Sequence, residues 1–352
     1  MIYDINKINE LVEQGYIRSS TKDELSIYCY TEKTTHEKYW NEYTRAARGL
    51  ILNNKTGEVI AKPFPKFFNL GEMPETYLSN LPTGGYTVSD KVDGSLGIIY
   101  YYNGKWNVAT KGSFSSEQAI KAQEMLKNWN LTEHFSHYTF LVEIIYPENR
   151  IVVNYGSQEK LVLLGAYRTH DESEINDLEV MSQITGLPIR KDYDYTIDEI
   201  IALQKVLSKN EEGFVIRFDN GLRIKVKGEE YLKIHKIISN LSPLSFWEVM
   251  KDGKVPLEYI QQVPEEFIPM FEPIVAQLEK KYLEVKKEVE DEFEMLPTKE
   301  ITPEAKKEVG LYLKKVSFFH ESAMFPRLMN KIEVVDRYIL KQIRPHGNSL
   351  NL

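Results

Sequence analysis

The chain has 352 residues, a hydrophobic fraction of 42% and a formal net charge of −8. This length fits one large or two ordinary domains with a real core, and an acidic chain that binds nucleic acid must gather its basic groups locally. A single cysteine, Cys29, excludes an internal disulfide and is typical of a reducing compartment. There is no signal-peptide pattern and no apolar run of membrane length, so we expect a cytoplasmic protein without a membrane partner.

From about residue 26 to residue 227 the chain alternates short β-branched and aromatic segments with turns, which predicts strands. Asn103 and Gly104 stand between two such segments and predict a two-residue hairpin turn. The expected strands cover residues 49–53, 86–89, 96–102, 105–110, 139–145, 161–167, 213–218 and 222–226. Together with the helices below, the pattern indicates an α+β fold with mostly antiparallel strands.

Helical spacing covers five segments, at 116–129, 197–207, 265–296, 303–319 and 325–342. Ser115 is expected to cap the first of these helices, with Gln118 as its capping-box partner. The strand pattern is absent beyond about residue 242. We therefore expect an α+β domain at residues 1–241 and a smaller, all-helical domain at residues 242–352.

One short segment carries a candidate nucleophile. Lys91 stands two residues before Asp93 and three before Gly94, on a turn between two predicted strands. A lysine attacks as a neutral amine, and burial or a neighbouring cation can lower its pKa far enough. The tetrapeptide alone should occur by chance in roughly one chain of this length in ten. Taken alone, it is explained more simply by a solvated hairpin lysine.

Other charged residues stand where a strand would need a reason for them. Arg48 opens one predicted strand, and Glu143 lies inside an apolar one, where a carboxylate without a partner is costly. Glu212 stands at the head of a further strand. Lys225 and Lys227 alternate with apolar residues, so both should project from one face of their strand. Taken singly, these two lysines are more often solvated than bound to a ligand.

Together these segments resemble the ordered motifs of the covalent nucleotidyltransferases, which include polynucleotide ligases and mRNA capping enzymes. The matching motifs are, in chain order, Lys91-Val-Asp93-Gly94, Glu143, Glu212-Gly213 and Lys225-Val-Lys227. Within this superfamily the chain resembles the phage-type, single-stranded RNA ligase 1 family. The likeness covers roughly residues 26–240 and is carried further by the segments 66–70, 111–119, 147–155 and 231–235.

The resemblance implies an ATP-grasp-like nucleotidyltransferase domain and an ATP-dependent RNA ligase. In that family the lysine, here Lys91, takes AMP from ATP, AMP passes to an RNA 5′-phosphate, and a 3′-hydroxyl displaces it to seal the strand. Lys225, Lys227 and a divalent metal would disfavour the protonated form of Lys91 and stabilise charge at the phosphate. We expect ATP, Mg²⁺ or Mn²⁺, and single-stranded RNA with 5′-phosphate and 3′-hydroxyl ends as the partners of a monomer.

Further roles are assigned through the resemblance alone. Asp93, Glu143 and Glu212 would hold the metal, partly through water, or bind the ribose hydroxyls. Glu143 is favoured for the ribose and Glu212 for the metal. The residues expected to contact the nucleotide are Tyr30, Arg48, Lys66, Asp93, Gly94, Lys111, Glu143, Glu212, Lys225 and Lys227, and Tyr231 is expected on the RNA side.

Three alternatives stay open. A DNA ligase or a capping guanylyltransferase uses the same lysine chemistry, but those enzymes usually continue into a β-rich barrel, whereas this chain continues into helices. An enzyme of another class could share only the motif. A non-catalytic RNA-binding module could be built on a ligase fold, although the intact set of charged motif residues speaks against it. No resemblance extends beyond residue 245, so RNA-end specificity is only an expectation for the helical domain.

Overall fold

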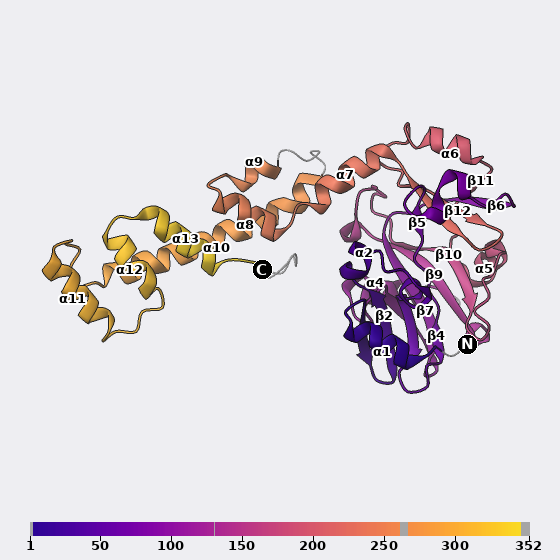
Figure 1. Cartoon of the computed structure of the whole chain (residues 1–352), viewed down its shortest axis with the longest axis horizontal. Coiled ribbons are helices and arrows are strands. Elements are labelled where there is room, and N and C mark those ends of the chain that lie inside the picture. The colour runs from indigo at the N-terminus through magenta and orange to yellow at the C-terminus, as the bar shows by residue number, and fades with distance from the viewer. Residues whose placement is uncertain (1–2, 130, 261–266, 346–352) are drawn as a thin grey trace. The chain divides into compact units, whose positions relative to one another are not determined.

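The structure is a computed structural model that describes residues 3–129, 131–260 and 267–345 (Figure 1). The chain divides into two units, Met1–Lys233 and Ile234–Leu352, and each is described here by itself. The division falls inside α7 (Glu229–Ser239), whereas the boundary expected from the sequence follows residue 241.

Three sheets form the first unit. The first has the order β1 (Ile17–Lys22), β2 (Leu25–Tyr30), β3 (Arg48–Asn53) and β4 (Val59–Ala61). The second has the order β10 (Lys160–Arg168), β9 (Tyr138–Ile145), β7 (Ser95–Tyr102) and β8 (Lys105–Thr110). The third has the order β11 (Asp192–Tyr193), β6 (Tyr86–Asp90), β12 (Gly213–Phe218), β13 (Arg223–Lys227) and β5 (Phe68–Asn69). All neighbouring strands are antiparallel except β13 and β5, which confirms the predicted α+β class.

Helices of this unit flank the sheets. They are α1 (Ile5–Glu13), α2 (Glu32–His36), α3 (Glu42–Ala46), α4 (Glu117–Leu126), α5 (Leu178–Thr185) and α6 (Ile197–Leu203), with short 3₁₀ turns at η1 (Pro74–Thr76), η2 (Leu78–Asn80), η3 (Glu133–Phe135) and η4 (Pro147–Asn149). The cap of α4 corrects the expectation: Ser116, not Ser115, is the N-cap, and its hydroxyl accepts from the backbone N–H of Ala119. Ala119 then occupies the position of a capping-box acid, so Gln118 plays no part in the cap.

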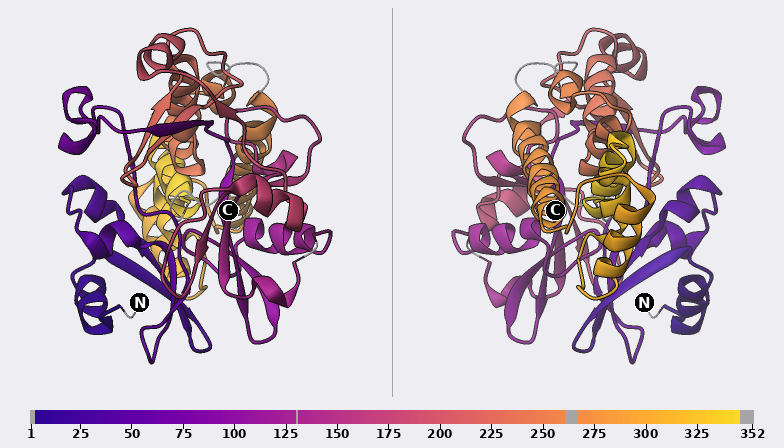
Figure 2. Two further views of the ribbon diagram at one scale, coloured as in Figure 1. Left: turned by 90° about the vertical axis from the view of Figure 1, so that its right-hand side faces the viewer. Right: turned by 90° about the vertical axis from the view of Figure 1, so that its left-hand side faces the viewer.

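The second sheet separates two apolar cores. Ile98 of β7 packs with residues of the first sheet such as Ile51, whereas its neighbour Ile99 packs on the other face with α4 and α5. Consecutive strand residues point to opposite faces, so one strand serves both cores. Figure 2 shows the indigo first sheet beside the magenta strands of the second sheet. Asn103 and Gly104 both have positive φ, at 51° and 75°, which confirms the predicted hairpin between β7 and β8.

The described part of the second unit is helical and contains no strand. Its helices are α8 (Pro243–Lys251), α9 (Pro256–Ile260), α10 (Ile268–Glu294), α11 (Pro303–Leu313), α12 (Glu321–Leu328) and α13 (Ile332–Gln342). The helix predicted at 325–342 is two helices, because Asn330 adopts φ of 53° between them. The helix predicted at 303–319 ends earlier, and residues 265–266 of a third prediction lie outside the described residues. None of the helices in the described ranges has the length and apolar character needed to cross a bilayer.

Candidate functional site

A cavity of about 620 Å³ opens in the first unit, and residues from all three sheets line it. Its lining includes ten lysine and arginine side chains but only two carboxylates, those of Asp90 and Glu143. Since the whole chain carries a net charge of −8, the cavity gathers cations against the overall charge, as a polyanion site requires. The basic residues are Arg18, Arg48, Lys66, Lys91, Lys111, Arg190, Arg217, Arg223, Lys225 and Lys227.

Lys91 lies just after β6, where the chain leaves the third sheet, and its backbone N–H donates to the carbonyl oxygen of Gly213. Its Nζ is 2.7 Å from Oε2 of Glu212, and the Nζ of Lys227 is 2.8 Å from the other oxygen of that carboxylate. The backbone at Gly213 has φ of 139°, and a Cβ there would lie 2.0 Å from the carbonyl oxygen of Val226. Glycine therefore permits the close approach of β12 and β13 that places Glu212 between the two lysines.

The electrostatics of Lys91 differ from the expectation. Burial lowers the pKa of its ammonium, but the surrounding carboxylates, led by Glu212, outweigh burial, and the pKa is raised overall. The pKa that falls is that of Lys225, to about 7, because of burial and three neighbouring lysines. The prediction that its neighbours lower the pKa of Lys91 is therefore wrong for the protein without nucleotide, since its ammonium is paired with Glu212.

Asp93 is engaged on the side away from the cavity. Its Oδ2 accepts hydrogen bonds from the backbone N–H groups of Val152 and Val153, both at 2.9 Å. Its Oδ1 accepts from the hydroxyl of Tyr231 at 2.8 Å. These contacts correct two expectations: the carboxylate of Asp93 is occupied by the protein rather than open to a metal or nucleotide, and Tyr231, at 1% exposure, is buried rather than on an RNA-facing surface.

Glu143 and Gly94 lie together in the cavity wall. A Cβ at Gly94 would be 2.6 Å from the carbonyl oxygen of Ile144 and 3.1 Å from Cγ of Glu143, so glycine lets the segment after Lys91 pass close to β9. Burial raises the pKa of Glu143 to about 8, only partly offset by Lys91. Glu143 has no hydrogen bond or ion pair with a described residue, so of the three predicted acidic residues it is the one whose carboxylate is open to a ligand.

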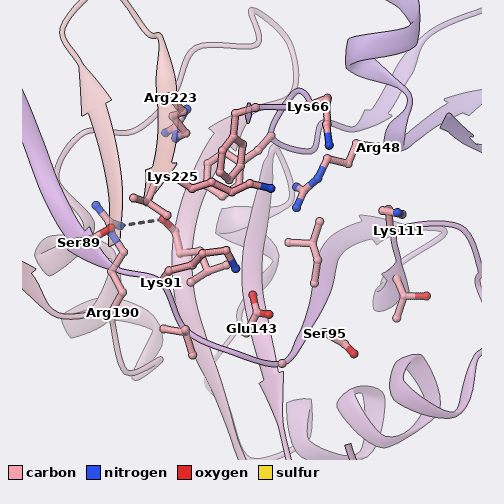
Figure 3. A pocket seen from close by; sticks show the side chains of 18 of the residues that line it. Arg48, Lys66, Ser89, Lys91, Ser95, Lys111, Glu143, Arg190, Arg223 and Lys225 are labelled. Carbon is pink, nitrogen blue, oxygen red and sulfur yellow. Dashed lines mark hydrogen bonds between the residues drawn. The ribbon is translucent and has the colours of Figure 1, made fainter. Parts of the chain in front are cut away.

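A second group of predicted residues gathers around the ring of Tyr30. The Nζ of Lys111 lies 4.7 Å from the centre of that ring and the Nζ of Lys66 lies 5.4 Å from it. Arg48 stacks near Phe67, and its buried Nη1 has no hydrogen-bond partner within the described residues. Such an unpaired buried donor indicates room for an acceptor such as a phosphate or ribose oxygen. Figure 3 shows Arg48, Lys66 and Lys111 on one side of Lys91 and Lys225.

Four arginines of the cavity were not predicted. Arg223 lies on the same face of β13 as Lys225 and Lys227, so the period-two pattern could have found it. Arg217 stands opposite Arg223 in the register of β12 and β13. The other two, Arg18 and Arg190, come from distant segments and carry no local signal.

The residues expected to hold a metal were tested against these contacts. Within the described residues, no group of three or more His, Cys, Asp or Glu side chains is arranged to hold an ion. Glu143 is open, and Glu212 is closed only by the two lysines. Mg²⁺ is often bound by one or two carboxylates together with substrate phosphates and water. The donor set therefore fits a metal that arrives with a nucleotide, and does not fit a closed protein cage.

Comparison with known proteins identifies relatives for most of the first unit. A sequence model of a family described as RNA ligase matches residues 46–232. A protein of Thermovibrio ammonificans named as an RNA ligase is 30% identical over 208 residues, covering 54% of this chain and 53% of that protein. A protein of Autographa californica nuclear polyhedrosis virus, named as a bifunctional polynucleotide kinase/RNA ligase, is 27% identical over 270 residues, covering 65% of this chain and 38% of that protein. The chain thus spans about half or less of the length of these relatives.

Among solved structures, an archaeal ATP-dependent RNA ligase superposes with a TM-score of 0.50. The two chains are 15% identical, and the match covers 93% of this chain and 95% of that one. At this identity the likeness shows the fold alone.

Proposed function

The chain belongs to the RNA ligase family, and on that premise we propose that it is an ATP-dependent RNA ligase. In this proposal it joins 5′-phosphate and 3′-hydroxyl ends of single-stranded RNA through a covalent Lys91–AMP. The observation that carries the proposal is the position of Lys91 in the wall of a cavity that gathers cations in an acidic chain. All of these groups come from one copy of the chain, which supports action as a monomer.

The first step transfers AMP to Lys91. The Lys91 ammonium must first lose a proton to solvent, which breaks its ion pair with Glu212. The amine lone pair then forms a bond to the α-phosphorus of ATP while the bond from that phosphorus to the bridging oxygen breaks. Pyrophosphate leaves with the electron pair, and the new phosphoramidate nitrogen releases its second proton to solvent.

The nucleotide itself can change the protonation of this group. Lys91 and Lys227 share the carboxylate of Glu212, and Lys225 lies near enough to both lysines for its pKa to fall. Phosphate oxygens between these lysines would give Lys225 and Lys227 an anionic partner other than Glu212. The same cations would stabilise the charge that develops on the α-phosphate. A divalent metal held by Glu143, Glu212 and phosphate oxygens would supply further positive charge there.

The other two steps consume the transferred AMP. The RNA 5′-phosphate oxygen attacks the phosphorus of Lys91–AMP, and the lysine nitrogen leaves and takes up a proton. The RNA 3′-hydroxyl then loses a proton and attacks the 5′-phosphorus, and AMP leaves with the electron pair of the broken bond. The buried donor of Arg48 and the open carboxylate of Glu143 are the groups we assign to the ribose and phosphate oxygens of AMP throughout.

We propose that the helical second unit holds the RNA ends. Several cations first considered for this role are already paired, Lys233 with Glu230 and Arg327 with Glu290. On α13 and the turn before it, Lys331, Arg337 and Lys341 are exposed and form no ion pair with a described carboxylate. These three remain as candidate contacts for backbone phosphates.

The proposal is tested by incubating the protein with α-labelled ATP, and separately with α-labelled GTP, and measuring the label on the chain. We expect labelling from ATP that is lost in Lys91→Ala. Lys91→Ala should still seal RNA that already carries a 5′-adenylate, because that step needs the nucleotide pocket but not the amine. An adduct on Lys91→Ala would remove Lys91 from the role, and labelling from GTP alone would favour a capping-type guanylyltransferase.

A further inference from the structure

The cations of the cavity differ in whether their charge is compensated, and the difference divides the cavity into two ends. At one end, Arg217 and Arg223 both form ion pairs with Glu174. Arg190 donates to the carbonyl oxygen of Leu164 at 2.8 Å. The apolar side chains of Val92, Leu164 and Val215 line the cavity with these arginines. This end offers apolar walls and little unpaired charge, which suits a nucleobase.

The opposite end holds cations that have no acidic partner. Arg18, Arg48, Lys66 and Lys111 form no ion pair with any carboxylate in the described ranges. Figure 3 places Lys91 and Lys225 between Ser89, Arg190 and Arg223 on one side and Arg48, Lys66 and Lys111 on the other. If Lys91 attacks an α-phosphate, a base at the compensated end leaves the β- and γ-phosphates at the uncompensated end.

Arg18 closes this second end from a strand that no predicted motif includes. It projects from β1 onto the turn after Lys111, and a Cβ at Gly112 would lie 2.8 Å from its Nη2. Arg18 lines the cavity together with Ser113 and Ser116, the residues that lead into α4. It is exposed and makes no hydrogen bond or ion pair with a described residue, so its guanidinium is available to a ligand.

We propose that Arg18 is a specificity-determining residue that binds the terminal phosphates of the nucleoside triphosphate and the pyrophosphate formed from them. Its planar fork matches two phosphate oxygens at once, which a lysine cannot do. The glycine at position 112 leaves room for the guanidinium over the turn, and the N-terminal turn of α4 adds favourable backbone dipoles on the same side. Arg18 therefore makes the site prefer a triphosphate over AMP. The assignment rests on the proposed function for the identity of the ligand.

Binding measurements on the full-length protein test the assignment without requiring turnover. The affinities for inorganic pyrophosphate, ATP and AMP are measured by calorimetry in the presence of Mg²⁺ for the wild type, Arg18→Gln and Arg18→Lys. A charge-assisted bidentate contact is worth roughly a tenfold change in affinity, so Arg18→Gln should weaken pyrophosphate and ATP by about that factor. The affinity for AMP should change less than about twofold, and Arg18→Lys should fall between the two other proteins.

Lys22→Gln is the matched control, because Lys22 is an exposed cation on the same strand that does not line the cavity. It removes one positive charge without reaching the proposed ligand. Equal losses for Lys22→Gln and Arg18→Gln would reduce the effect to general electrostatics and overturn the assignment. So would wild-type affinity for pyrophosphate in Arg18→Gln with an unchanged melting temperature.

Kinetics separate this inference from the proposed function. In Arg18→Gln we expect KM for ATP in Lys91 labelling to rise, and the reversal of Lys91–AMP by pyrophosphate to need a higher pyrophosphate concentration. If Arg18→Gln instead impairs only RNA binding, Arg18 belongs to the RNA path and the assignment fails. If the wild type never acquires AMP yet Arg18→Gln still loses pyrophosphate affinity, the proposed function fails and the anion site stands.

Discussion

The hydroxyl of Tyr231 donates a hydrogen bond to Oδ1 of Asp93 at 2.8 Å, although the two residues are 138 positions apart. Tyr231 lies in the first turn of α7, and Asp93 lies two residues after Lys91. The other oxygen of Asp93 is held by two backbone N–H groups. The segment that carries Lys91 is therefore fixed at its far side by contacts that do not involve the nucleotide.

Removing this hydroxyl should destabilise the protein. Tyr231→Phe leaves Oδ1 of Asp93 buried without its donor, which typically costs about 1–3 kcal/mol of unfolding free energy. It should also slow Lys91 labelling, because the segment around Lys91 loses one of its fixed points. Urea unfolding of Tyr231→Phe measures the cost. Tyr77→Phe removes a hydroxyl from a tyrosine that is 46% exposed and should change stability little; an equal loss in both would contradict the special role of Tyr231.

The raised pKa of Glu143 predicts a pH-dependent cost in the protein without nucleotide and metal. Its folded pKa is about 8, whereas an ordinary glutamate titrates near 4.5. The unfolded chain therefore releases this proton first, and the stability that protonated Glu143 gives is lost as pH rises from about 4.5 through 8. At 1.36 kcal/mol per pKa unit, Glu143→Gln should gain a few kcal/mol over the wild type across this interval.

Unfolding of both proteins from pH 5 to pH 9 in the presence of a chelator checks this expectation. The lowered pKa of Lys225 acts in the opposite direction above pH 7, because its unfolded form binds more protons there. That contribution is common to wild type and Glu143→Gln and cancels in their difference. A difference that stays constant with pH would show that Glu143 is ionised throughout.

Lys225 predicts proton uptake on nucleotide binding. Its pKa of about 7 leaves the amine mostly neutral at pH 8, and an adjacent phosphate would raise that pKa again. Binding of AMP at pH 8 should therefore take up as much as about one proton, and at pH 5.5 almost none, since Lys225 is already protonated there. Calorimetry in two buffers of different ionisation enthalpy counts the protons. Lys225→Gln should abolish the difference between the two pH values, and undiminished uptake in this variant would assign the proton elsewhere.

The exposed cations of the helical unit predict a salt effect confined to RNA. Changing Lys331, Arg337 and Lys341 to glutamine should weaken sealing and flatten its dependence on salt, because each lost phosphate contact lowers the slope by about one. Lys91 labelling by ATP should stay close to wild type in the same protein. A variant with Lys307, Lys314 and Lys315 changed to glutamine removes three cations from α11 and the residues after it as a control. Similar sealing slopes in both variants would return the second unit to a stabilising or partner-binding role.

Local patterns predicted the parts of the fold that depend on local interactions. The turn at Asn103 and Gly104 follows from two residues that accept positive φ, and the shared face of Lys225 and Lys227 follows from the period of a strand. The break at Asn330 was missed because apolar spacing continues across it and only one backbone conformation interrupts the helix. The same limit explains the cap of α4, where neighbouring serines are equivalent in sequence.

The site was predictable to the extent that its residues belong to recognisable motifs. Proximity to Lys91 could be inferred for Glu212, but the sharing of its carboxylate between two lysines could not, and this sharing decides the protonation of Lys91. Asp93 was misassigned for a related reason, since nothing near it in sequence reveals Tyr231 as its partner. Arg18 depends entirely on how β1 meets a turn more than ninety residues away in the chain.

The cavity draws its reacting groups from three separate sheets: Arg48 begins a strand of the first, Glu143 belongs to the second, and Lys225 to the third. Each sheet can keep its own hydrogen bonds while the spacing between sheets relaxes. A partly opened state would then retain its strands and still lose the arrangement of charges around Lys91. Heat or denaturant should therefore inactivate the protein before its secondary structure melts, so enzymatic half-life is a more sensitive gauge of its integrity than circular dichroism.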